Sequence, residues 1–253
     1  MIRYYCSGFD VNNVFGHGLG DMIKTELINT KSIVYIVGNP KKPEKIKKAK
    51  EVHIPSFTES FKNVGISFDN FHVITQDTSP EDAKKWIDES GFLMLMGGDP
   101  FDQKEMCENL EIIDNIKNYQ GVMMGFSAGA MLMSKYMIIT PCSEEYPNFR
   151  IEKGLNFDDI SIYPHNNTSS EEYPEELISG KEVYKKQDLI KVANEYGKYY
   201  LLQDYQREDG LFDISIIKSS NGIIEHYIEN NGKIWEVSDD INLVLTAENK
   251  KVK

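Results

Sequence analysis

A buried strand that turns sharply into a helix is encoded by Val122-Met123-Met124-Gly125-Phe126-Ser127-Ala128-Gly129-Ala130. Small residues flank the serine, as a tight strand-to-helix turn (a nucleophile elbow) requires, because larger side chains would collide there. Such a turn exposes the serine hydroxyl above the sheet, and the amide of Ala128 can then stabilise an oxyanion. The stretch predicts that Ser127 is the nucleophile of a serine hydrolase. A closely packed strand–helix junction without catalytic function is the alternative.

A second glycine turn ends the preceding apolar run. Residues 92–96 are uninterrupted apolar and lead into Gly97-Gly98-Asp99. In open α/β sheets, ligands bind at the carboxyl ends of strands, and paired glycines let a backbone amide approach a substrate. We therefore expect the amide of Gly98 or Asp99 to supply a second oxyanion donor beside Ser127. An acidic side chain at this position is unfavourable unless it points away from the oxyanion.

Apolar runs of strand length alternate with amphipathic stretches along most of the chain. Continuous apolar strands indicate a parallel sheet that is buried on both faces. Ser79 and Pro80 form a good helix start, with the serine as N-cap and the proline at the first helical position. The pattern predicts an α/β fold with a mostly parallel sheet and helices on both faces. The expected strands are 2–7, 32–37, 71–75, 92–96 and 121–125, and the expected helices are 79–89, 101–118 and 128–136.

The pattern changes after about residue 199. Short strands separated by Gly-containing turns are expected at 199–202, 212–217, 223–228 and 233–237. We interpret residues 199–240 as a hairpin-rich extension that is added to an edge of the sheet. Residues 1–253 are therefore expected to form a single α/β domain.

Composition and charge indicate which kinds of binding partner and which cellular compartment we expect for this protein. The 253 residues carry a formal net charge of −12, which disfavours nucleic acid as a partner. The densest basic run, residues 41–50, is expected to be a solvated helix face rather than a polyanion site. The three cysteines show no paired spacing, and the sequence has neither a signal-peptide pattern nor an apolar run of about 18 residues. These features favour a soluble cytoplasmic protein. No metal-type cluster or phosphate loop suggests a cofactor, and the oligomeric state is left open.

The two glycine turns together resemble the motifs of a known family of serine peptidases. The pattern Gly97-Gly98-x-x-Phe101, a helix, and then Gly125-x-Ser127-Ala-Gly-Ala is similar to the dipeptidase E and cyanophycinase family. The resemblance extends over roughly residues 1–237 and is sharp over residues 92–135. It implies a fold similar to class I glutamine amidotransferases, with serine in place of cysteine. It also implies peptide hydrolysis by a Ser-His-acid triad in that chain order.

The same resemblance indicates partners for Ser127. The family's histidine follows a strand and a proline, as His165 does here. The family's acid comes at the end of a later strand, which places Asp204 at that position, although Glu208 or Asp209 could substitute. The chemistry agrees, because a serine hydroxyl needs an imidazole to take its proton and a carboxylate to orient that imidazole.

The other histidines and one lysine are the remaining candidates for residues of the site. His17 lies in a Gly-rich loop and could approach the site. His53 and His72 come far before the elbow in the chain, and His226 alternates within a hairpin strand. The aspartyl dipeptidases carry an arginine that pairs with the substrate's aspartate, and Lys185 falls nearest to that position. Lysine lacks the bidentate fork of arginine, so aspartyl specificity is not implied; a solvated helix face is the alternative for this residue.

Three functions are open at this point. The leading prediction is hydrolysis of small peptides through an acyl-enzyme on Ser127, and a cyanophycinase-like hydrolase of another amide would use the same residues. A catalytically silent binding protein of the same fold is the third, and Asp99 beside the oxyanion position is its main support. A glutamine amidotransferase is disfavoured, because none of the three cysteines lies at the elbow.

Overall fold

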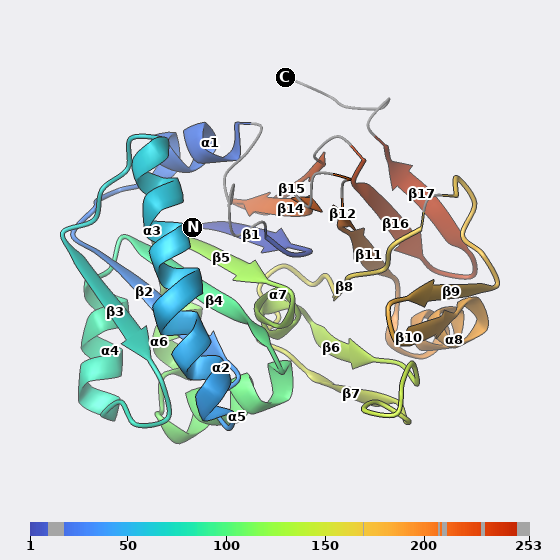
Figure 1. Cartoon of the computed structure of the whole chain (residues 1–253), viewed down its shortest axis with the longest axis horizontal. Helices are drawn as coiled ribbons and strands as arrows, with labels where there is room; N and C mark the ends of the chain where they lie inside the picture. The colour runs from blue at the N-terminus through green and yellow to red at the C-terminus, as the bar shows by residue number, and fades with distance from the viewer. Residues whose placement is uncertain (10–17, 169, 207, 209–211, 229–230, 247–253) are drawn as a thin grey trace.

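A seven-stranded, mostly parallel sheet forms the centre of the computed structural model among the residues that it describes (Figure 1). Strand order is β15-β14-β1-β5-β4-β2-β3, and the five strands from β1 to β3 in this order run parallel. The described residues are 1–9, 18–168, 170–206, 208, 212–228 and 231–246. The strands are β1 (Ile2–Cys6), β2 (Ser32–Gly38), β3 (Asn70–Ile74), β4 (Phe92–Gly98), β5 (Val122–Phe126), β14 (Ser215–Ser220) and β15 (Ile223–Ile228).

Helices cover both faces of this sheet, because its central strands alternate apolar side chains toward each face. Tyr4 and Tyr35 pack under α1 and α3, whereas Tyr5 and Val34 belong to the core under α4, α5, α6 and α7. Helix α3 crosses the sheet face that is turned to the viewer in Figure 1. The helices are α1 (Leu19–Glu26), α2 (Pro43–Lys48), the π-helix η1 (Ala49–His53), α3 (Ile54–Asn63), α4 (Pro80–Glu89), α5 (Pro100–Asn109), α6 (Ile113–Asn118), α7 (Ala128–Met133) and α8 (Lys186–Tyr196).

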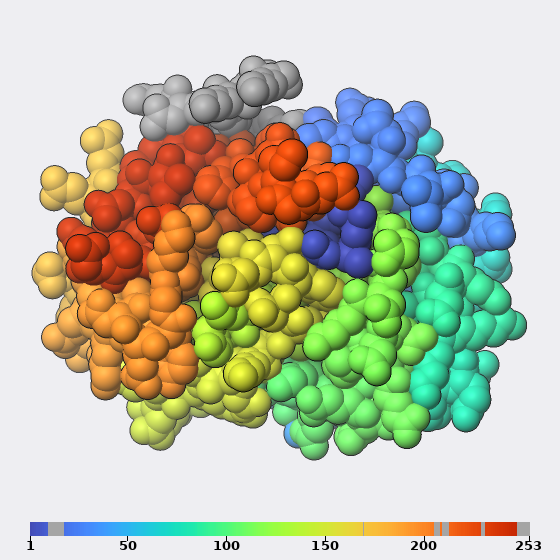
Figure 2. Space-filling model, turned by 180° about the vertical axis from the view of Figure 1, so that it is seen from behind, coloured from blue at the N-terminus to red at the C-terminus, as the bar shows by residue number. Residues whose placement is uncertain are grey.

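A second sheet lies beside the first and is built mainly from the C-terminal part of the chain. Its strand order is β17-β16-β11-β8, in which β8 and β11 are parallel and the other pairs are antiparallel. The segment around β6 to β8 lies between the two parts when the molecule is seen from behind (Figure 2). These strands are β6 (Tyr136–Ile139), β7 (Arg150–Lys153), β8 (Ile162–Pro164), β9 (Glu176–Ser179), β10 (Glu182–Lys185), β11 (Tyr199–Gln203), β12 (Tyr205–Gln206), β13 (Phe212–Asp213), β16 (Lys233–Val237) and β17 (Ile241–Leu245).

The hairpin-rich C-terminal region is present as predicted, but its strands divide between two sheets. Strands β14 and β15 extend the main sheet next to β1, as expected. The expectation that all strands after residue 199 extend that sheet is wrong for β11, β16 and β17. The physical reason is a separate apolar core, in which Leu201 of β11 and Trp235 of β16 pack with α8.

Two predicted helices are shorter than expected. The stretch 101–118 forms α5 and α6, which are separated at Glu111, where φ is 53°. Leu110 and Ile112 are both buried around this break, and residues two positions apart cannot share one face of a single helix. The helix after the elbow ends at Met133 instead of continuing to residue 136, because the chain turns at Ser134 to extended backbone. The Ser79 cap is confirmed by its side chain, which accepts a hydrogen bond from the amide of Asp82.

None of the helices in the described part of the chain combines the length and the apolar character that crossing a membrane requires.

Candidate functional site

Ser127 occupies the turn between β5 and α7 with a backbone conformation that is rare for a residue with a side chain. Its φ is 51° and its ψ is −112°. The amide of Ser127 donates to the carbonyl oxygen of Cys6 in β1 at 3.0 Å, and its own carbonyl accepts from Met131 at 3.0 Å. Such a conformation costs on the order of 1–3 kcal/mol and persists only where neighbouring contacts enforce it. The turn has the backbone of a nucleophile elbow.

The glycines of the elbow are required by close backbone approach. A Cβ atom at Gly129 would lie 2.1 Å from the carbonyl oxygen of Leu95 in β4. A Cβ atom at Gly125 would lie 2.6 Å from the carbonyl carbon of Gly129. No real side chain tolerates these distances, so Gly125 keeps the turn tight and Gly129 lets α7 pack closely against β4.

His165 and Asp204 are brought to the same place by neighbouring strands. His165 follows β8 and Asp204 follows β11, and these two strands are parallel. His165 Nε2 lies 2.7 Å from Ser127 Oγ, and His165 Nδ1 lies 3.0 Å from Asp204 Oδ2. The three side chains named by the sequence analysis therefore form one continuous hydrogen-bonded chain.

The electrostatics of the pair select one tautomer of the imidazole. A carboxylate can only accept, so Nδ1 of His165 carries the proton toward Asp204 and leaves Nε2 to accept from Ser127. Burial lowers the pKa of His165, but the charge and hydrogen bond of Asp204 outweigh it and hold that pKa above its ordinary value. Burial raises the pKa of Asp204, yet His165 brings it below its ordinary value. The carboxylate is therefore ionised at neutral pH.

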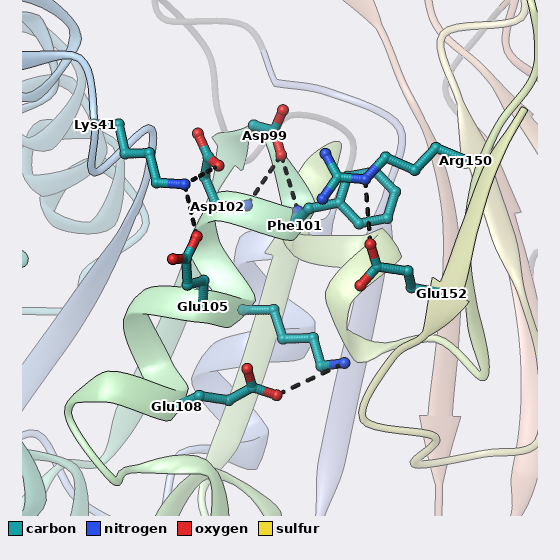
Figure 3. A network of polar contacts seen from close by, with 9 residues as sticks. Lys41, Asp99, Phe101, Asp102, Glu105, Glu108, Arg150 and Glu152 are labelled. Atoms are coloured by element: carbon teal, nitrogen blue, oxygen red, sulfur yellow. Dashed lines mark hydrogen bonds and ion pairs between the residues drawn. The ribbon is translucent and has the colours of Figure 1, made fainter. Parts of the chain in front are cut away.

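The side chain of Asp99 caps a helix and is not among the described residues that line the cavity at Ser127. Its carboxylate caps α5 and accepts from the amides of Phe101 and Asp102 at 2.9 and 3.0 Å (Figure 3). The backbone amide of Asp99 donates to the carbonyl oxygen of Gly38 at 2.8 Å. The carboxylate and the backbone amide of Asp99 are thus engaged elsewhere, and of the two expected donors only Gly98 lines the cavity beside Ser127.

A cavity of about 540 Å³ opens at Ser127 and His165. One wall comes from the stretch that includes α2 and η1, and it presents Lys45, Lys48 and His53. Burial and the two lysine charges lower the pKa of His53, so its imidazole is neutral at neutral pH. This wall does not follow from the sequence, because the lysine-rich run has the pattern of a solvated helix face and His53 comes far before the elbow in the chain. The π-helix η1 would have pointed to this wall, because π-bulges often occur at functional sites. It has no distinct sequence pattern, so it could not be predicted.

The remaining candidates lie away from this cavity or outside the described residues. Lys185 does not line the cavity, and its Nζ lies 4.0 Å from a carboxylate oxygen of Glu176. His72 stacks on Trp86, His226 on β15 lies against Tyr200, and Glu208 is exposed. His17 and Asp209 are outside the described residues.

No group of three or more His, Cys, Asp or Glu side chains in the described ranges is arranged to hold a metal ion.

Comparisons with known proteins identify the family and the fold. The sequence model of peptidase family S51 matches residues 43–196, which is more than half of the chain. No curated protein matches the sequence. A peptidase from an acI-B1 Actinobacterium has a similar structure, with a TM-score of 0.61 and 11% sequence identity over 97% of this chain and 94% of that one. A candidate peptidase E from Listeria monocytogenes EGD-e aligns with a TM-score of 0.47 and 17% identity over 73% of this chain and 97% of that one.

The first of these structural likenesses, at 11% identity, supports the α/β fold alone. The family match extends over β4, the elbow and His165. The chain belongs to peptidase family S51 and is a serine-type peptidase of the dipeptidase E type.

Proposed function

We propose that the protein hydrolyses short peptides through an acyl-enzyme in which Ser127 is the nucleophile, His165 the general base and Asp204 the orienting acid. The observation that carries this proposal is the unbroken contact from Ser127 Oγ through the imidazole to Asp204, at 2.7 and 3.0 Å. The left-handed φ of Ser127 supports it, because strained backbone of this kind concentrates at functional sites.

The proposed reaction follows from this geometry. Ser127 Oγ attacks the peptide carbonyl while its proton passes to His165 Nε2, and Asp204 stabilises the resulting imidazolium. The amides of Ala128 and Gly98 are the donors for the oxyanion of the tetrahedral intermediate. The C–N bond then breaks as the leaving amine takes the proton from His165, which leaves an acyl ester on Ser127. A water molecule gives a proton to His165 and attacks this ester, and the proton returns to Ser127 Oγ as the carboxylic acid product is released.

The shape and charge of the cavity favour a small substrate that carries a carboxylate. A volume of about 540 Å³ lies within the range of small-molecule sites. Neither Lys45 nor Lys48 has an acidic partner within ion-pair distance in the described part of the chain, although the whole protein carries an excess of acid. Asp204 is the one acidic residue among the described residues that line the cavity, and it faces His165. The wall of two lysines is therefore a site for an anionic group of the peptide.

A fluorophosphonate probe tests the nucleophile without knowledge of the substrate. We expect wild-type protein to be labelled at Ser127, and Ser127→Ala to lose labelling while it stays folded. Ser90→Ala is the matched control, since it removes a buried hydroxyl that donates to the Ile87 carbonyl at the opposite end of β4. Folded wild-type protein that is not labelled, or a Ser127→Ala variant that is labelled equally, would contradict the proposal.

A further inference from the structure

A buried amide joins the strand that carries Asp204 to the loop that carries His165. Gln203, the last residue of β11, is fully buried. Its Nε2 donates to the carbonyl oxygen of Thr168 at 2.9 Å. Its Oε1 accepts from the indole Nε1 of Trp235 in β16 at 3.3 Å. The residue next to the acid therefore holds the segment that follows the base.

The two partners determine the orientation of this amide. The indole nitrogen of Trp235 can only donate, and the carbonyl oxygen of Thr168 can only accept. A flipped Gln203 amide would face each of them with the wrong group and leave both unsatisfied in a buried place. The contact is therefore directional, and an apolar side chain of the same size cannot reproduce it.

Backbone pairing between β8 and β11 stops before the functional residues. Pro164 and Leu202 are the last paired residues, so His165 and Asp204 both lie beyond the ladder. His165 has a φ of 64°, a conformation that is uncommon for a residue with a Cβ atom. The hydrogen bond from Gln203 to Thr168 ties this loop to β11 at the point where the backbone ladder no longer does.

The same tryptophan also supports the loop through a second route. The ring of Tyr173 contacts Trp235 edge to face, with ring centroids 5.6 Å apart and an interplanar angle of 83°. The hydroxyl of Tyr173 donates to Oδ1 of Asn166, the fully buried residue after His165. Trp235 thus supports the loop through two neighbours, Gln203, which contacts Thr168, and Tyr173, which contacts Asn166.

We propose that Gln203 is a positioning residue that keeps His165 within hydrogen-bond distance of both Ser127 and Asp204. It acts through the loop 165–168 and is not among the described residues that line the cavity. The inference rests on the proposed function, because it assigns Gln203 a role only if His165 is the base. A displacement of about 1 Å in such a group lowers a rate by about 100-fold.

The test compares Gln203→Met with wild-type protein in fluorophosphonate labelling of Ser127 across pH. We expect the maximal inactivation rate to fall about 10- to 100-fold while the probe's KI changes less than threefold. We also expect the pH midpoint of labelling to fall, because a looser contact with Asp204 removes the influence that raises the pKa of His165. A merely structural role would leave that midpoint unchanged in the folded fraction.

Tyr119→Phe is the matched control, since it also removes a buried hydrogen bond to a main-chain carbonyl, that of Ser90, away from the cavity. It is expected to lower the melting temperature and to keep the pH midpoint.

If Gln203→Met does not fold, Trp235→Phe is the second test, because it keeps an aromatic ring at this position and removes the indole donor. The same direction of change is expected for this variant. An unchanged rate and midpoint in a folded variant overturns the positioning role. Wild-type protein that is not labelled at all contradicts the proposed function instead.

Discussion

Pro164 and Leu202 are paired in the parallel strands β8 and β11, and this pairing brings together the residues that follow them. Asp204 comes two positions after Leu202, and its side chain is only 9% exposed. From this position it reaches Nδ1 of His165, which follows Pro164 directly. Asp204 is therefore placed by a strand pair rather than by a local sequence motif, and its proposed role as the orienting acid can be measured directly.

Replacing Asp204 with asparagine is expected to lower kcat/KM by about 10⁴-fold, because the imidazole loses the carboxylate that fixes its tautomer. The pH midpoint should also fall, since the charge that raises the pKa of His165 is removed. Steady-state kinetics across pH measure both effects. Asp77→Asn, at an exposed position, is the control. Loss of activity in Glu208→Gln instead of Asp204→Asn would show that another acid completes the triad.

The pH dependence of wild-type activity follows from the state of His165. As the proposed base, His165 must be neutral to accept the proton of Ser127, and Asp204 raises its pKa above the ordinary value of 6.5. Activity should therefore be low in acid and rise with pH through a midpoint above 6.5. The measurement is kcat/KM against pH at constant ionic strength. A midpoint below 6.5 would mean that Asp204 does not influence the base in solution.

Lys45→Met and Lys48→Met are expected to lower kcat/KM about tenfold for carboxylate-bearing peptides and to leave neutral analogues within twofold. Lys47→Met is the matched control on the same helix, because Lys47 lies outside the cavity and near Glu51. Peptides with an amidated C-terminus and peptides with glutamine in place of glutamate show which carboxylate is recognised. Equal losses for neutral and acidic peptides would contradict the role of the lysine wall.

The buried pair Arg3–Asp158, which anchors the first strand, is expected to contribute strongly to the free energy of unfolding. Both oxygens of Asp158 accept from the guanidinium at 2.8 Å, and Tyr5 and Ser219 donate to the same carboxylate. Asp158→Asn should lower the free energy of unfolding by about 3–5 kcal/mol in urea titrations. Asp159→Asn, next to it, breaks an exposed pair with Lys135 and should cost less than about 1 kcal/mol.

The same carboxylate predicts how stability depends on pH. Burial raises the pKa of Asp158, but the hydrogen bonds from Arg3, Ser219 and Tyr5 bring it below its ordinary value. A lowered pKa in the folded state means that the contribution is present above the unfolded pKa and is lost as pH falls through the folded pKa. Wild-type protein should therefore lose more stability between about pH 5 and pH 2 than Asp158→Asn does.

Asp99→Ala is expected to destabilise the protein by about 1 kcal/mol through loss of the α5 cap, whereas Asp99→Asn should be nearly neutral. Thermal unfolding distinguishes the two variants. If instead Asp99→Asn greatly raises the labelling rate of Ser127, the wild-type carboxylate acts on the oxyanion after all.

The sequence alone determined the features that depend on a few neighbouring residues. The elbow at Ser127 follows from small residues between a strand and a helix, and the parallel sheet follows from uninterrupted apolar runs such as 92–96. The Ser79 cap is equally local, since donor and acceptor lie three residues apart. The family resemblance added His165 and Asp204, which the strand order then brought beside Ser127.

The tertiary structure alone decided what depends on contacts between distant residues. Lys45, Lys48 and His53 face the cavity because η1 and its neighbours fold over the carboxyl ends of the strands, about 80 residues before Ser127. Gln203 meets Thr168 and Trp235 because β8, β11 and β16 share a sheet. The direction of the Asp99 side chain depends on which amides lie nearest. Periodicity reports which face of an element is apolar, but not which other element covers that face, and the site is built from those pairings.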